Sequence, residues 1–317
     1  MSARPPDPGS EPRYTRAMRP AQESLEDRCD AALALRSQPD GSFASRPGGE
    51  SRVDATAWAA MALAAGDAAP EAVRAARAQL AAEQREDGRL AAHPDHPQAA
   101  WPTPLAILAW LGDPEHTGSL ERAVTFLLES TGLHWPPDPA AAIGHDTSIE
   151  GWPWIQETHS WVEPTSLCML ALSAAGRGGH PRVREAARLL LDRRLPGGGW
   201  NYGNSLVFGS ELRPLPESTG VALHALAGRA ATNDVEAGLA YLAGALQAIR
   251  TPFTLGWGVM GLAAWGRRPP AAEVWLSESL ERQSRFGAYD TAHLALLALA
   301  ARRPEGLLVD APKEEHG

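Results

Sequence analysis

Four segments of the chain repeat one pattern, in which an acidic residue stands at the start of an apolar run and a leucine follows nine residues after the acid. The segments are VDATAWAAMAL from Val53, VEPTSLCMLAL from Val162, PESTGVALHAL from Pro216 and YDTAHLALLAL from Tyr289. Two further runs, WPTPLAILAW from Trp101 and FTLGWGVMGL from Phe253, carry an aromatic residue in place of the acid. The six residues at this position, here called anchor residues, are Asp54, Trp101, Glu163, Glu217, Phe253 and Asp290. A pattern with a loose period predicts stacked supersecondary units with insertions in their loops.

A second helix signal precedes the anchored runs. Proline at a first helical position or threonine at a cap starts PEAVRAARAQLAAEQ at Pro70, TGSLERAVTFLLES at Thr117, PRVREAARLLLDRR at Pro181 and TNDVEAGLAYLAGAL at Thr232. These segments have polar faces, whereas the anchored runs are apolar nearly all round, which is typical of helices buried on most sides. Each repeat therefore pairs an amphipathic outer helix with a buried inner helix.

Six such helical hairpins predict an all-α fold, an (α/α)6 toroid whose inner helices surround a central axis. An open superhelix is the alternative. We expect the toroid to span residues 21–303, between a disordered N-terminal tail at 1–20 and a flexible C-terminal tail at 304–317, because both ends are rich in proline, arginine and glutamate.

Composition excludes several function classes. The formal net charge of −9 does not favour nucleic acids or anionic membranes as partners. The only lysine is Lys313, so chemistry that needs a Schiff-base or phosphate-loop lysine is not expected. The two cysteines, Cys29 and Cys168, give no disulfide framework. The sequence shows no secretory signal and no apolar run long enough to span a bilayer, and we expect a cytoplasmic protein.

The turn from Gln38 to Phe43, with the form Q-x-x-G-x-aromatic, the segment GGGWNYG at 197–203 and the acid-led inner helices resemble the prenyltransferase and squalene-cyclase repeat superfamily. The resemblance covers roughly residues 21–302. It implies an (α/α)6 toroid with a central, aromatic-lined cavity that holds an apolar, isoprenoid-type substrate. It also implies one of two chemistries, that of the terpenoid cyclases or that of the protein prenyltransferases.

The prenyltransferase chemistry uses zinc, held by an Asp-x-Cys pair and a distant histidine. Asp27 and Cys29 have the pair's spacing but fall on the first outer helix, and Asp290 stands where the histidine is expected. His93 and His96 form a lone H-x-x-H in a proline-containing loop. We therefore expect no metal and no other cofactor.

The resemblance to class II terpenoid cyclases places Asp54 at the middle acid of their D-x-D-D-T-A motif, which protonates an alkene or an epoxide. The matching stretch here is RVDATA, with Arg52 and Ala55 in place of the other two acids. An arginine two residues away favours the ionised carboxylate. Asp54 is therefore either structural or acts on a group more basic than an alkene.

In a closed ring the inner helices all run in one direction, so Asp54, Glu163, Glu217 and Asp290 should gather at one rim as candidate catalytic acids. The alternative is that each only caps its helix, since helix N-termini favour carboxylates. His159 is a further candidate acid or base because it stands near Glu163 in the sequence.

Tryptophans surround these acids. The predicted substrate-binding residues are Trp58, Trp101, Trp152, Trp154, Trp161, Phe253 and Trp257. Indole faces stabilise cations and pack against apolar ligands. Residues 131–162 form a long insertion, and long loops in compact domains are often binding loops. We expect this insertion to fold over the rim, whereas Phe43 and Trp200 are expected to pack between repeats.

The sequence therefore predicts a terpenoid cyclase-like or prenyltransferase-like enzyme that acts on an isoprenoid-type apolar substrate. The alternative is a non-catalytic toroid that binds an apolar ligand or a partner protein. The chain is short for a two-domain cyclase, so a partner chain or an oligomer is also considered.

Overall fold

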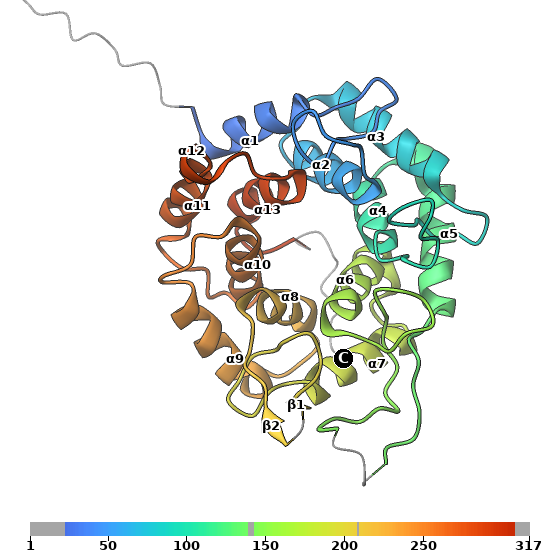
Figure 1. Ribbon diagram of the computed structural model, residues 1–317, viewed down its shortest axis with the longest axis vertical. Helices are drawn as coiled ribbons and strands as arrows, with labels where there is room; N and C mark the ends of the chain where they lie inside the picture. The colour runs from blue at the N-terminus through green and yellow to red at the C-terminus, as the bar shows by residue number, and fades with distance from the viewer. Residues whose placement is uncertain (1–22, 139–142, 208, 308–317) are drawn as a thin grey trace, which may run out of the picture.

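The computed structural model describes residues 23–138, 143–207 and 209–307, and within them the helices form two concentric rings (Figure 1). The outer ring contains α1 (Leu25–Ala34), α3 (Pro70–Glu83), α5 (Thr117–Glu129), α7 (Pro181–Asp192), α9 (Thr232–Ala245) and α11 (Ala272–Glu281). The inner ring contains α2 (Val53–Ala65), α4 (Thr103–Trp110), α6 (Val162–Leu172), α8 (Pro216–Leu226), α10 (Pro252–Ala263) and α13 (Thr291–Arg302). The prediction of an (α/α)6 toroid is confirmed. The predicted N-terminal tail at 1–20 and residues 308–317 of the predicted C-terminal tail lie outside the described residues.

Four short elements complete the described structure. They are the 3-10 helix η1 (Pro114–His116), the π-helical turn η2 (Ser173–Arg177) that continues α6, the single turn α12 (Gln283–Phe286) and an antiparallel hairpin of β1 (Leu206–Val207) and β2 (Ser210–Glu211).

The ring is closed by contacts between its first and last repeats. The Nη1 atom of Arg302 on α13 donates to Asp30 of α1 at 2.9 Å and to the carbonyl of Ala62 on α2 at 3.0 Å. At the other end of α13, the Nη1 atom of Arg36 donates to Thr291 Oγ1 at 2.9 Å. These contacts exclude the open superhelix.

Buried threonines join successive elements in a repeated way. In four repeats the Oγ1 atom of an inner-helix threonine accepts a hydrogen bond from the backbone N–H of a residue in the preceding turn. The pairs are Thr56 with Phe43 (2.9 Å), Thr103 with Leu90 (3.0 Å), Thr165 with Trp152 (3.0 Å) and Thr219 with Trp200 (2.9 Å). Each of the four turn side chains is buried. The motif fixes where each inner helix begins.

Gly88 shows why these turns need glycine. Its φ is +92°, and a Cβ added there would lie 2.2 Å from the carbonyl oxygen of Arg122 on α5. We predict that Gly88→Ala lowers the free energy of unfolding by more than the ~1–3 kcal/mol that backbone strain alone costs. Gly112→Ala is the matched control, since Gly112 has φ +73° but open space around its Cβ position. Urea unfolding of both variants measures the difference, and equal losses would show that the contact with α5 is unimportant.

Candidate functional site

The anchor residues stand at the beginning of the inner helices, and together they form what we call the acid rim. Asp54, Glu163 and Glu217 are each the second residue of their helix. Neighbouring helices are linked there, because Ser218 Oγ donates to Glu163 at 2.8 Å and Thr254 Oγ1 donates to Glu217 at 3.1 Å. Sequence reasoning missed both hydroxyl residues, although Ser218 directly follows an anchor acid.

A side-chain capping hydrogen bond is present for one of the four acids. Asp290 is the N-cap of α13, and its carboxylate accepts from the backbone N–H of His293 at 2.9 Å. The side chains of Asp54, Glu163 and Glu217 make no capping hydrogen bond. These three acids lie in the first turn of their helices, where the N-terminus favours a carboxylate, but their oxygens are not committed to a capping hydrogen bond as those of Asp290 are.

Asp54 and Glu163 differ in their surroundings. Arg52 Nε lies 2.8 Å from Asp54 Oδ1, so a positive charge is paired with this carboxylate. Among the described residues, Glu163 is paired with no arginine. Burial raises the pKa of Glu163, the hydrogen bond from Ser218 opposes that change, and the negative charge of Glu217 raises the pKa further. Glu163 is therefore the better candidate for an acid that holds its proton.

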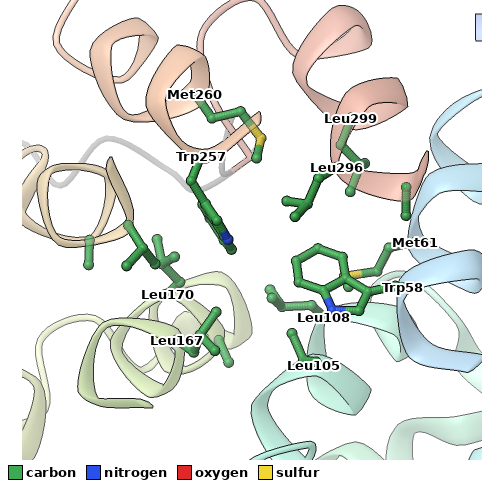
Figure 2. Close-up of a cluster of buried hydrophobic side chains, with 14 of the residues drawn as sticks. Trp58, Met61, Leu105, Leu108, Leu167, Leu170, Trp257, Met260, Leu296 and Leu299 are labelled. Carbon is green, nitrogen blue, oxygen red and sulfur yellow. The ribbon is translucent and has the colours of Figure 1, made fainter. Parts of the chain in front are cut away.

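Two tryptophans meet at the centre of the inner ring, as Figure 2 shows. Trp58 and Trp257 pack edge to face with ring centroids 5.9 Å apart, and both are almost fully buried. Each lies four residues beyond its anchor, one helical turn below the rim. Leucine and methionine side chains of the inner helices surround the pair. The centre of the ring is thus lined by apolar side chains, and the pair forms a floor beneath the acid rim.

Three further predicted aromatic residues lie near the starts of inner helices. Trp101 and Trp154 pack edge to face at 5.7 Å between ring centroids, and Phe253 lies 6.1 Å from the ring of His293. Trp154 belongs to the insertion and so brings one part of it to the first turn of α4. Trp101, Trp154 and Phe253 are all partly exposed.

The expectation that the insertion covers the rim is wrong for most of it. Figure 1 shows its described part beside α7, outside the inner ring, and the N–H of Asp146 donates to Asp192 at the end of α7 at 3.0 Å. Hydrogen bonds between backbone groups of the insertion hold it in this place. Leu133 N donates to Thr158 O at 2.8 Å, and Trp135 N donates to Thr147 O at 3.0 Å.

Trp152 and His159 are placed away from the candidate site. Trp152 is buried, its Nε1 donates to the carbonyl of Leu127 at 2.9 Å, and the guanidinium of Arg182 lies 4.4 Å from its ring centre. This is a packing role between repeats. His159 is exposed, its ring centre lies 4.5 Å from that of Trp161 with the two rings tilted by 45°, and it lines a cavity beside the insertion. Neither is carried into the proposed site.

A cavity of about 430 Å³, lined by both apolar and polar groups, lies toward the C-terminal ends of the inner helices. Met61, Leu108 and Leu299 line it, and Arg77 and Leu307 lie at its edge. Its lining residues lie in the C-terminal halves of α2, α4 and α13, so the cavity lies beyond the acid rim along the inner helices.

The residues that could hold a metal do not meet at the rim. Burial raises the pKa of the Cys29 thiol to about 12, which disfavours the thiolate that zinc needs. Among the described residues, Asp113, Glu115 and His116 come close enough to one another to share an ion. Asp113 accepts a hydrogen bond from Glu115 N at 3.0 Å and pairs with Arg77, so its carboxylate caps the N-terminus of η1.

In the part of the chain that the structure describes, every helix is too short or too polar to cross a bilayer.

Neither a protein-family model nor a curated protein matches the sequence. Similarity is found instead among solved structures. A protein from Actinoplanes matches with a TM-score of 0.58 and 18% identity, over 90% of this chain and 99% of its own.

Two enzymes share the architecture. An inactive variant of the α-1,6-mannanase GH76A of Salegentibacter matches with a TM-score of 0.62 and 9% identity, over 88% of this chain and 98% of that one. The ent-copalyl diphosphate synthase from Streptomyces platensis matches with a TM-score of 0.51 and 18% identity, over 80% of this chain but only 50% of that one. At these identities the likeness concerns the fold alone. The chain has an α/α toroid fold, which it shares with the diphosphate synthase and with the mannanase.

Proposed function

We propose that this protein is an enzyme that transfers a proton from Glu163 to an oxygen atom of an isoprenoid-type substrate, such as an epoxide, bound at the acid rim. The single observation that carries the proposal is the position of Glu163. It is a partly buried carboxyl group that pairs with no arginine among the described residues, and Leu167, one helical turn further along α6, belongs to the cluster around the central tryptophan pair.

The electrostatics of Glu163 favour an oxygen over an alkene carbon as the proton acceptor. A raised pKa keeps a carboxyl group protonated more of the time, but it also makes the group a weaker acid. An epoxide oxygen is far more basic than a carbon–carbon double bond, so a moderate acid suffices. In this step the O–H bond of Glu163 breaks, a bond forms between the proton and the epoxide oxygen, and positive charge develops on the adjacent carbon as the ring opens.

The aromatic residues are proposed to stabilise the positive charge that develops on the substrate. Trp58 and Trp257 form the floor, and Trp101, Trp154, Trp161 and Phe253 are proposed as walls. Indole faces attract cations by about 0.5–2 kcal/mol, more when water is excluded. Glu217, held by Thr254, is positioned beside Glu163 to stabilise the cation or to accept the final proton. Asp54 is not proposed as the proton donor, because its carboxylate is paired with Arg52.

The same pair of carboxylates also suits hydrolysis of a glycosidic bond, in which one acid protonates the leaving oxygen and the other activates water. The partial exposure of Glu163 and Glu217 favours this second candidate. We prefer the first because the floor is made of indole, leucine and methionine side chains, which match an apolar chain better than sugar hydroxyls.

Ligand retention tests the choice. Protein purified in detergent-free buffer is extracted and its lipids are identified by mass spectrometry, and quenching of tryptophan fluorescence is then followed with farnesol, geranylgeraniol, their terminal epoxides and mannose oligosaccharides. The proposal expects isoprenoid binding that Trp257→Phe weakens. Binding of the oligosaccharides alone would favour the hydrolase, and binding of isoprenoids without turnover would favour a non-catalytic binding protein.

A further inference from the structure

A second cavity, here called the loop cavity, lies between the insertion and the segment that follows α7. It encloses about 380 Å³, a volume within the usual range for small-molecule sites. Its apolar walls include Leu133, Trp135, Ile143 and Leu206, and His145 and Arg193 provide its polar side. Ser205 Oγ donates to the carbonyl of Gly144 at 2.8 Å, which ties its two parent segments together.

Arg193 is the unusual member of this lining. Only 5% of the residue is exposed, yet its guanidinium has few partners. Nη1 donates to the carbonyl of Gly203 at 2.9 Å, and Nε is buried without a hydrogen-bond acceptor. A guanidinium carries five N–H donors, and leaving a buried polar group unpaired is unfavourable. Burial accordingly lowers the pKa of Arg193 to about 10.

The charges around Arg193 only partly offset it. Asp192 Oδ2 lies 3.4 Å from Nε, without hydrogen-bonding geometry, and the same oxygen accepts from Asp146 N at 3.0 Å. The Asp146 carboxylate accepts instead from Ser148 N and Ser148 Oγ, with Arg188 at 3.9 Å. Nε is buried and faces Asp192, whereas Nη2 has no hydrogen-bond partner among the described residues, so its donors are the ones that a ligand in the loop cavity could use.

The imidazoles of the lining add no competing charge. Burial, with the charge of Arg193 and the proximity of His159, lowers the pKa of His145 to about 4, and burial with Arg193 also lowers the pKa of His159. Both rings are therefore neutral near pH 7. The Nδ1 atom of His145 is buried and has no hydrogen-bond partner, so a second polar atom in this wall is unsatisfied.

We propose that the loop cavity is a binding site for a small amphipathic acid, whose carboxylate pairs with Arg193 and whose apolar part packs between Trp135, Ile143 and Leu206. The planar guanidinium matches a carboxylate through two parallel hydrogen bonds. Such a ligand gives the Nη2 donors of Arg193 an acceptor and covers the exposed apolar walls in one binding event. The site is independent of the acid rim and does not require that the proposed reaction be correct.

Isothermal titration with decanoate and with decanol, both below the concentration at which they aggregate, tests this proposal on the full-length protein. The two probes share an apolar chain and differ in charge. We expect decanoate to bind at least about tenfold more tightly than decanol, because a charge-assisted hydrogen bond usually contributes about that much to affinity. Arg193→Met should abolish that difference, whereas Arg188→Gln, a change of an exposed side chain, should preserve it.

Trp135→Ala keeps the test decisive if Arg193→Met does not fold. Trp135 is 42% exposed, so its loss should leave the melting temperature nearly unchanged while it weakens both probes severalfold. Glu163→Gln should leave both affinities as they are. Equal affinity for decanoate and decanol, or full decanoate affinity in Trp135→Ala, would overturn the assignment.

Discussion

Replacing Trp200 by alanine is expected to lower the free energy of unfolding by about 3–5 kcal/mol, the usual cost of truncating a large buried aromatic side chain. Trp200 is fully buried and joins three helices. Its Nε1 donates to the carbonyl of Leu190 on α7 at 2.6 Å, and its backbone N donates to Thr219 Oγ1 of α8 at 2.9 Å. Gly238 of α9 leaves room for the ring, because a Cβ there would lie 2.8 Å from it.

Urea unfolding followed by circular dichroism measures this cost. Tyr202→Ala is the control, since Tyr202 lies two residues away but is 55% exposed, and exposed substitutions usually change stability by no more than about 0.5 kcal/mol. A loss for Trp200→Ala as small as that of the control would mean that the turn aromatics do not hold the repeats together.

The second large effect is expected on turnover. Glu163→Gln should reduce the rate at least about 100-fold, because general acid catalysis contributes roughly 10²–10⁴ and a glutamine side chain has no proton to give. Asp290→Asn is the matched rim control. Asparagine caps helices as well as aspartate does, so this variant should keep both its stability and its rate. A similar loss in both variants would mean that rim charge in general, and not the acid at Glu163, supports the reaction.

The pH dependence separates a chemical effect from unfolding. Glu163 must be protonated to act, so the rate should fall as the pH rises through its pKa, which lies above the ordinary value of 4.5. The same shift has a defined sign for stability. A raised pKa in the folded state contributes stability that is present below the unfolded pKa and is lost as the pH rises through the folded one. Glu163→Gln should therefore not destabilise the protein at neutral pH, where the buried ionised form is penalised.

The ring architecture was predictable from the sequence because burial is periodic. The outer helices show a polar face and the inner helices do not, and the anchored runs mark where each inner helix begins. The spacing of threonine after each acid also distinguishes Asp290 from the other three acids. Threonine follows two residues after Asp54, Glu163 and Glu217 but directly after Asp290. Because that threonine is the buried one, the shift by one residue moves Asp290 into the N-cap position.

The insertion was harder to predict because irregular segments carry no periodicity. Nothing in the spacing of Trp152 and Trp154 tells which one is buried between repeats and which one reaches Trp101. The answer depends on Thr165, which binds the backbone N–H of Trp152 at 3.0 Å and so fixes its ring inside. The loop cavity was missed for a similar reason, since His145 and Arg193 are distant in sequence and are brought together only by the ends of two loops.

Turnover of an epoxide tests the central claim most directly. The purified protein is incubated with the terminal epoxide of geranylgeraniol and, separately, with geranylgeraniol itself, and the products are analysed by gas chromatography and mass spectrometry. The account predicts that the epoxide alone is converted, to a rearranged or cyclised isomer of unchanged mass, and that Glu163→Gln loses this activity. Conversion by Glu163→Gln at the parent rate, or a folded wild-type protein that binds the epoxide and leaves it unchanged, would contradict the assignment of Glu163 as the proton donor.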